Sequence, residues 1–169
     1  IKIENEMIVF TSTFLSYLDQ EDFKKFLNDS TDYSIHQFDK LYNSENWQNG
    51  FVLYRKSSRK DVFRILNVSE NPVAQNVGGY LVSPDNSHCP IFINYHKEEH
   101  ISASTKYEDE FLNNKELDWM SKSNRTINSK DVQSILGKNG VIRLPLFIKK
   151  NNDEGMDFYY MGEVIPVLN

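Results

Sequence analysis

The sequence has almost no cysteine, and this scarcity excludes one common way of stabilising a fold. Its 169 residues contain a single cysteine, Cys89, so no disulfide can form within the chain. A lone thiol is typical of the reducing cytoplasm, where we expect this protein to reside. The sequence also lacks a signal peptide and any apolar run near the ~20 residues of a membrane-spanning helix, so we expect no membrane partner. Because the chain starts at Ile1 and not at a methionine, we interpret it as a piece of a longer protein.

Motifs of common enzymes are absent as well. There is no Walker-type phosphate loop, and the serines of SASTKYE lack the glycines of a nucleophile elbow. His88, Cys89, His96 and His100 lie within thirteen residues, but the adjacent His-Cys pair does not have the spacing of paired zinc ligands. The acidic run at 108–110 lacks the partnered lysine or histidine of a nuclease motif. We therefore expect no metal site and no enzymatic activity in this chain itself.

Negative charge is in excess, but only in the first part of the chain. Residues 1–50 carry four Lys and Arg against nine Asp and Glu, whereas residues 51–169 carry fifteen of each. Apolar residues at helical spacing predict that the acidic part is helical. We expect residues 1–49 to form an acidic helical coupler segment and residues 50–169 to form a separate domain, on which local basic surfaces are still possible.

After Asn49 and Gly50 the pattern changes to short strands. Two short helices are predicted to begin at Ser58 and Ser129, because each serine has the position of a helix cap. Together with the first segment, these elements predict an α+β fold: a curved sheet or partly closed β-barrel flanked by short helices, after an N-terminal helical segment. Strands are predicted over residues 50–57, 78–83, 89–96, 141–150 and 157–168.

The densest basic stretch is YRKSSRKDVFR, at the start of the first of these short helices. Basic side chains in a first helical turn oppose the helix dipole, and a phosphate group bound there would relieve that cost. The alternative is a solvated helix start without a ligand. The candidate phosphate contacts in this stretch are Lys56, Ser57, Ser58, Arg59 and Lys60, which Lys149 and Lys150 extend if the fold brings them together.

Four longer stretches resemble a bacterial domain found at the C-terminal end of proteins that combine a phospholipase-D-like nuclease with a helicase. The resemblance covers about residues 50–165 and points to the SauUSI-type, modification-dependent (type IV) restriction enzymes, which cleave DNA containing 5-methylcytosine. It implies that the chain is their target-recognition domain. The stretches are FVLYRKSSRKDV, CPIFINYHKEEHISASTKYEDEF, LDWMSKSNRT and LFIKKNNDEGMDFYYMGEV.

A second resemblance concerns the segment from Lys106 to Arg125. SET-and-RING-associated (SRA) domains, which have a PUA-like fold, flip a 5-methylcytosine out of duplex DNA and stack it between two aromatic side chains. Their pocket motif runs tyrosine, acid, second aromatic, small polar turn and arginine. The residues that follow this order here are Tyr107, Glu110, Trp119, Ser121 and Arg125.

The segment also departs from the SRA pattern. Trp119 replaces the usual tyrosine, the glycine-rich turn reads SKSN, and Asp109 is an alternative to Glu110 as the pocket acid. The resemblance implies a base pocket to which Phe92 and Tyr95 contribute, although the same two residues are equally suited to a strand core. It also implies DNA-backbone contacts by Lys106, Ser121, Lys122 and Arg125.

The function that follows from these resemblances is recognition of 5-methylcytosine, with 5-hydroxymethylcytosine as a second candidate, in double-stranded DNA by base flipping. The recognition domain would direct cleavage by the helicase and nuclease domains of the same polypeptide, which require ATP and Mg²⁺, and would itself need no cofactor. Two alternatives remain: a coupling module that docks on the helicase without reading bases, and an enzyme that acts on modified bases or RNA.

Overall fold

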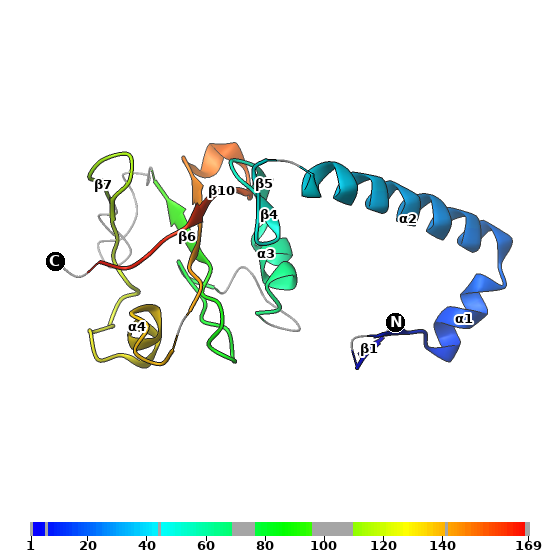
Figure 1. Ribbon diagram of the computed structural model, residues 1–169, viewed down its shortest axis with the longest axis horizontal. Coiled ribbons are helices and arrows are strands. Elements are labelled where there is room, and N and C mark those ends of the chain that lie inside the picture. The colour runs from blue at the N-terminus through cyan, green and yellow to red at the C-terminus, as the bar shows by residue number, and fades with distance from the viewer. Residues whose placement is uncertain are drawn as a thin grey trace. The chain divides into compact units, whose positions relative to one another are not determined.

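The computed structural model describes residues 2–5, 7–43, 45–68, 77–95, 110–140 and 142–167 (Figure 1). The chain divides into two compact units, Ile1–Glu45 and Asn46–Asn169, which we call the first and the second unit. Each is considered separately. None of the described helices combines the length and the apolar character needed to cross a lipid bilayer.

The first unit consists of a short antiparallel hairpin followed by two helices. Thr11 caps the first helix, because its hydroxyl accepts a hydrogen bond from the backbone N–H of Phe14 at 3.3 Å. The helical character predicted for this segment is confirmed, but the hairpin was not predicted. The elements are β1 (Lys2–Glu4), β2 (Met7–Val9), α1 (Ser12–Leu18) and α2 (Glu21–Tyr42).

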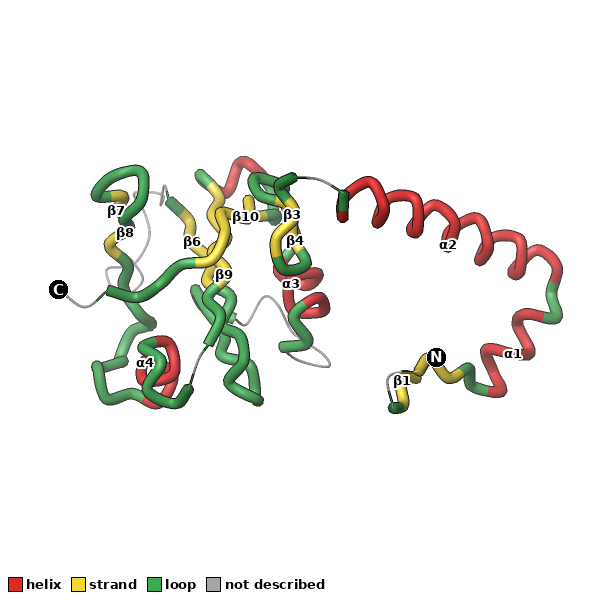
Figure 2. Tube along the Cα trace, in the orientation of Figure 1, coloured by secondary structure: helices red, strands yellow, loops and turns green. Residues whose placement is uncertain are grey.

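The second unit is built around an open four-stranded sheet with the strand order β5-β10-β9-β6. Within this sheet β6 and β9 run parallel, and the other neighbours are antiparallel. Figure 2 shows β6, β9 and β10 side by side. Its elements are β3 (Trp47–Gln48), β4 (Phe51–Val52), β5 (Lys56–Ser57), α3 (Arg59–Ile65), β6 (Ile91–Asn94), β7 (Glu110–Phe111), β8 (Leu117–Asp118), α4 (Lys130–Ile135), β9 (Pro145–Lys149), η2 (Asn152–Glu154) and β10 (Phe158–Glu163).

Both faces of the sheet are buried along β6 and β9, whereas Tyr159 and Met161 of β10 are not buried. Side chains alternate along a strand, so Phe92 and Phe147 lie on one face and their neighbours Ile91 and Leu146 lie on the other. The first face packs against Val62 and Phe63 of α3, and the second packs against Tyr80, Cys89 and Ile135 of α4. A sheet covered on both sides reads as continuous apolar runs, as the strands β6 and β9 do.

The predicted α+β class is confirmed at this level, but the barrel alternative is not. Within the described part of the chain, the strands form one open four-stranded sheet and three two-stranded pairs and do not close into a barrel. Both predicted short helices are present. Ser58 caps α3 by accepting from the backbone N–H of Asp61 at 3.1 Å, and Gly137 ends the turn after α4 with a φ of 72°, a backbone conformation that favours glycine.

Candidate functional site

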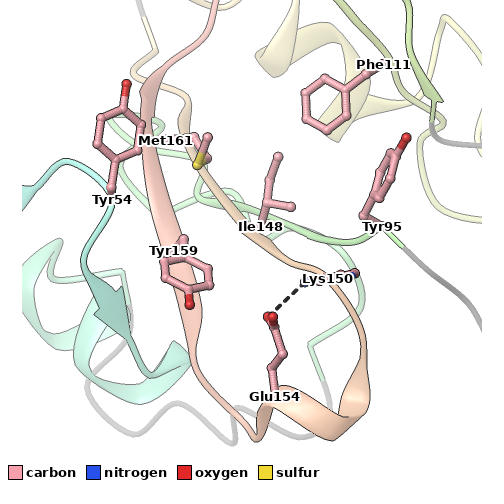
Figure 3. Close-up of a pocket in the computed structure, with 8 residues that line it drawn as sticks. All are labelled: Tyr54, Tyr95, Phe111, Ile148, Lys150, Glu154, Tyr159 and Met161. Atoms are coloured by element: carbon pink, nitrogen blue, oxygen red, sulfur yellow. Dashed lines mark hydrogen bonds between the residues drawn. The ribbon is translucent and has the colours of Figure 1, made fainter. Parts of the chain in front are cut away.

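A shallow hollow of about 260 Å³ lies on the second unit, and four of its eight lining residues are aromatic (Figure 3). Ile148 and Tyr159 form its floor, because they are register partners on the neighbouring strands β9 and β10. The sheet therefore positions this floor directly. We call the site the aromatic hollow, and its lining residues are Tyr54, Tyr95, Phe111, Ile148, Lys150, Glu154, Tyr159 and Met161.

Two rings of the aromatic hollow come from different segments and pack against each other in a tilted contact. Tyr95 directly follows β6 and Phe111 lies in β7; their ring centroids are 5.3 Å apart and the rings are tilted by 51°. Their side chains are 38% and 39% exposed, so each keeps part of its surface available to a ligand. Large apolar rings with accessible faces are suited to stacking on a planar molecule.

Tyr54 stands at the opposite side of the aromatic hollow, in an unusual conformation. Its φ of 63° is in the left-handed region, and its side chain is 64% exposed. The backbone is held there by β10, because the N–H of Tyr54 donates to the carbonyl of Tyr160 at 2.8 Å. A non-glycine residue that keeps such a conformation without burying its ring is typical of a functional surface.

The polar groups of the aromatic hollow lie along one side of it. The backbone N–H of Lys150 donates to Oε2 of Glu154 at 3.2 Å, which leaves the second carboxylate oxygen able to accept from a ligand (Figure 3). Lys56 lies close by: its Nζ is 4.8 Å from the ring centroid of Tyr159 and donates to the carbonyl of Glu154 at 3.4 Å. The site thus combines aromatic faces, one carboxylate and nearby cations.

The predicted base pocket is only partly covered by the described residues. Tyr107, Asp109 and Lys106 lie outside them, and so does the side chain of Glu110, whose backbone pairs with Asp118 in the β7–β8 hairpin. Of the two additional candidates, Tyr95 lines the aromatic hollow. Phe92 is in the core on the α3 face, stacked on Phe147 at 5.2 Å.

Trp119 lies in a different place from the aromatic hollow. Its ring meets Tyr80 edge-on at 5.4 Å and packs against the core on the α4 face. Beside it, the hydroxyl of Tyr80 and Nε of Arg125 both donate to Oδ2 of Asp131 at 2.7 Å. Burial of Tyr80, followed by its bond to Asp131, raises the pKa of the phenol, so the hydroxyl stays a donor at neutral pH.

The predicted phosphate contacts also separate into groups. Lys56 and Lys60 are exposed, whereas Arg59 is partly buried against aromatic rings and Ser58 is engaged as the cap of α3. Ser57 belongs to β5 and pairs with Phe158 in the sheet. In the Tyr80 region, Nζ of Lys122 lies 4.4 Å from the Tyr80 ring, Ser121 is partly buried, and Arg125 is ion-paired with Asp131.

The structure describes two members of the histidine and cysteine cluster. Cys89 is a core residue, and the ring of His88 is hydrogen-bonded to Ser87. Cys89 is fully buried in the core on the α4 face, and burial raises the pKa of its thiol to about 12. Burial, and then the charge of Arg143, lower the pKa of His88. His96 and His100 lie outside the described residues, and among those that are described no three His, Cys, Asp or Glu side chains are arranged to hold a metal ion.

Sequence reasoning missed most of the aromatic hollow. Of its lining residues, only Tyr95 was a pocket candidate, and Lys150 was named as an extension of the basic surface. The run DFYYMGE contains a usable signal, because Tyr159 and Met161 alternate with the buried Phe158 and Tyr160 and therefore share the opposite face. Tyr54 is in a turn and Glu154 ends the short 3-10 helix η2, and no periodicity identifies either of them.

The second unit is thus an α+β domain with an aromatic hollow on a sheet whose strands β6 and β9 are buried on both faces. Its sequence matches a protein family over residues 51–169, and the chain belongs to that family, the domain of unknown function DUF3427. No curated protein gives a significant match to the chain.

Proposed function

We propose that the second unit is a DNA-binding recognition module that accepts a flipped 5-methylcytosine, with 5-hydroxymethylcytosine as a second ligand. It would belong to a longer, modification-dependent restriction enzyme and direct cleavage by that enzyme's nuclease and helicase domains. Its fold would be SRA-like, with the open four-stranded sheet as the described core. The observation that carries this proposal is the aromatic hollow, above all the adjacent, partly exposed rings of Tyr95 and Phe111.

The dimensions of the aromatic hollow suit one base. Pockets for drug-sized ligands have volumes of roughly 300–1,000 Å³. A hollow of about 260 Å³ lies just below that range and is large enough for a single planar ring system. Because it is open to the surface, a flipped nucleotide can enter without any displacement of the core.

The energetics of base flipping are compatible with an aromatic site. Extrusion of a base from the duplex costs a few kcal/mol, least for a base that pairs weakly. Stacking on an aromatic side chain contributes about 1–3 kcal/mol per base. Two rings that contact the same base can therefore offset the cost of extrusion. Tyr107 and Trp119, the rings of the SRA-like motif, are the alternative pair.

A carboxylate in the site would identify cytosine by its exocyclic amino group. Glu154 is the described candidate, because it lines the aromatic hollow, and Glu110 or Asp109 are the candidates from the motif. A carboxylate accepts from the N4 amino group of cytosine, whereas thymine has no donor at that position and would leave the acid unpaired. Rejection of thymine should consequently be strong.

The methyl group itself provides less discrimination. Burial of one methyl carbon contributes about 0.8 kcal/mol, roughly fourfold in affinity. We expect the remaining selectivity to come from later ATP- and Mg²⁺-dependent steps of the parent enzyme. No cofactor is needed for binding by this domain. A thousandfold preference of the isolated chain for methylated DNA would contradict this division of labour.

Fluorescence anisotropy with two duplexes that differ only in one 5-methylcytosine tests the proposal. We expect Tyr95→Ala and Phe111→Ala to weaken binding of the methylated duplex by about 5- to 150-fold each, from the stacking energy of 1–3 kcal/mol. Tyr33→Ala, at an exposed tyrosine of α2, is the matched control and should bind normally. Tyr107→Ala and Trp119→Ala test the motif-based pair in the same assay.

Two results would contradict the proposal in different ways. Equal affinity of the unmodified chain for the two duplexes would remove modified-base recognition. Unchanged affinity in all four aromatic variants would remove the base pocket, even if the methylated duplex were preferred.

The second candidate function is docking, and an observation on the first unit favours it. No residue of the fully described helices α1 and α2 is buried, and α2 exposes large apolar side chains such as Phe26 and Phe38. Such a surface suits attachment to the helicase part of a longer protein. Salt distinguishes the functions, because DNA binding weakens steeply as salt is added and apolar docking does not.

A further inference from the structure

A buried lysine lies at the end of β9, on the α3 face of the sheet. Lys149 is only 6% exposed, although a lysine is rarely buried without a charged partner. Its Nζ donates to the backbone carbonyl of Gly155 at 3.1 Å and lies 5.0 Å from the ring centroid of Phe158. An ammonium group carries three N–H donors, so this single hydrogen bond leaves donors unused.

A second cation lies over the same ring. The guanidinium carbon of Arg59, from the first turn of α3, is 4.9 Å from the ring centroid of Phe158 and 5.2 Å from that of Phe92. Its Nη1 donates to the carbonyl of Val77 at 3.5 Å, and its Nε is buried without a hydrogen-bond partner. Arg59 as a whole remains partly exposed.

The described residues around the pair compensate its charge only in part. Among the described residues, neither Arg59 nor Lys149 forms an ion pair with a carboxylate. Glu154 is the acid whose charge is felt at Lys149, but its carboxylate accepts from the backbone N–H of Lys150. Burial, and then the charge of Arg59, lower the pKa of Lys149. Two like charges at a partly dehydrated position are costly unless an anion compensates them.

We propose that Arg59 and Lys149 form a binding site for an oxyanion of the phosphate class. The N–H groups that the described residues leave without an acceptor, on the guanidinium of Arg59 and on Nζ of Lys149, match the several acceptor oxygens of such a group, and phosphate is a preferred ligand of guanidinium groups. The anion would complete the compensation of the two positive charges, to which Glu154 contributes only in part. This inference concerns a site other than the aromatic hollow and does not need a base to be flipped.

Two ligands would supply such an oxyanion: a phosphate group of the DNA backbone and a free phosphate ion. Lys56 and Lys60, at either side of Arg59 in the sequence, are exposed and could guide a nucleic-acid strand past the site. Only the arm of the test that uses DNA rests on the proposed function.

The first arm uses the complete 169-residue chain and inorganic phosphate without DNA. Thermal unfolding is followed in phosphate and in sodium chloride at matched ionic strength, and the affinity is measured by calorimetric titration. We expect phosphate to raise the Tm beyond the effect of chloride, and we expect Arg59→Met and Lys149→Met each to abolish that rise and to weaken binding at least about tenfold, since each removes charge-assisted hydrogen bonds.

Arg64→Met is the matched control, because Arg64 belongs to the same helix but is exposed and paired with Asp61 at 3.7 Å. It should keep the full response to phosphate. Methionine keeps an unbranched apolar side chain of similar length, so the variants are expected to fold, and circular dichroism before each titration verifies this. A response that is equal in all four proteins would overturn the proposal.

The second arm identifies the source. A phosphate of DNA at this site predicts that Lys149→Met reduces the slope of log K against log salt by about 0.9, the value for one lost phosphate contact, whereas Arg64→Met leaves the slope unchanged. If Lys149→Met loses the rise of Tm in free phosphate but keeps the slope of log K against log salt, the ligand is a free phosphate ion. No response to phosphate in the unmodified chain, together with an unchanged slope in Lys149→Met, rejects the site. Because the first arm contains no DNA, its failure is separate from a failure of base recognition.

Discussion

The two units have similar fractions of apolar residues but use them in opposite ways. Helix α2 of the first unit leaves Phe26 72% exposed, and no residue of α1 or α2 is buried. In the second unit, Phe63 and Phe147 are fully buried between the sheet and α3. Aromatic contacts do occur in the first unit, as between Phe10 and Phe14 at 5.0 Å, but they do not enclose a core.

This difference shows that an apolar helical pattern specifies a helix without specifying what covers it. Full burial of a Phe or Leu side chain contributes about 1.5–3 kcal/mol, and α2 gains little of this from the described residues of its own unit. The stability of a short helix depends mostly on such packing. We infer that the second unit carries most of the folding stability of this chain and that the first unit is adapted to a surface outside it.

The largest change in the free energy of unfolding is expected when an aromatic side chain is removed from the core of the second unit. Phe147→Ala removes a side chain that contacts Phe51, Phe92 and Tyr160, and we expect a loss of about 3–5 kcal/mol in the free energy of unfolding. Phe26→Ala, in α2, should change it by no more than about 0.5 kcal/mol. Urea denaturation followed by fluorescence measures both. Equal losses would mean that the first unit has a core of its own.

A smaller effect is expected from the helix caps, which have the same chemistry in both units. Ser58 caps α3 and Thr11 caps α1 through side-chain oxygens. Ser58→Ala should lower the free energy of unfolding by about 1 kcal/mol, because α3 covers the core. Thr11→Ala should reduce the helical circular dichroism signal but leave the main unfolding transition in place. A shift of the main transition by Thr11→Ala as large as that by Ser58→Ala would show that the two units unfold together.

The elements that sequence reasoning identified are those with a local cause. Ser58 begins α3 by accepting a hydrogen bond from the backbone N–H of Asp61. Ser129 begins α4 through its extended backbone, without a side-chain capping bond, and the positive φ of Gly137 ends the turn after that helix. The hairpin β1–β2 was missed because strands of three residues have too little alternation to be recognised. The parallel pairing of β6 with β9 joins residues more than fifty positions apart, which no local pattern encodes.

The candidate site was harder to predict for a related reason. In a sheet buried on both faces, consecutive residues of a strand are all apolar, so the sequence does not show which of them point to the same side. Ile148 therefore could not be assigned to the hollow side, nor Lys149 to the α3 side, before the register was known. Tyr95 was predictable because it ends a strand next to a long polar segment.

The smallest effect concerns an exposed turn of the second unit and depends on pH. Hydrogen bonds from Ser83 and then from Ser87 lower the pKa of Asp85 to about 2, below its ordinary 3.8. A carboxylate whose folded pKa is depressed stabilises the fold above its unfolded pKa, and this contribution is lost as the pH falls through the folded value. We expect the Tm of the unmodified chain to fall more steeply than that of Asp85→Asn between about pH 4 and pH 2. The substitution Asp32→Asn in α2 should leave the slope as it is, because it lies in the unit without a core. Parallel curves of Tm against pH for the unmodified chain and Asp85→Asn would show that this turn unfolds independently of the rest of the second unit. The contrast between a unit with a core and a unit without one would then apply to the sheet and its helices, but not to the turns that connect them.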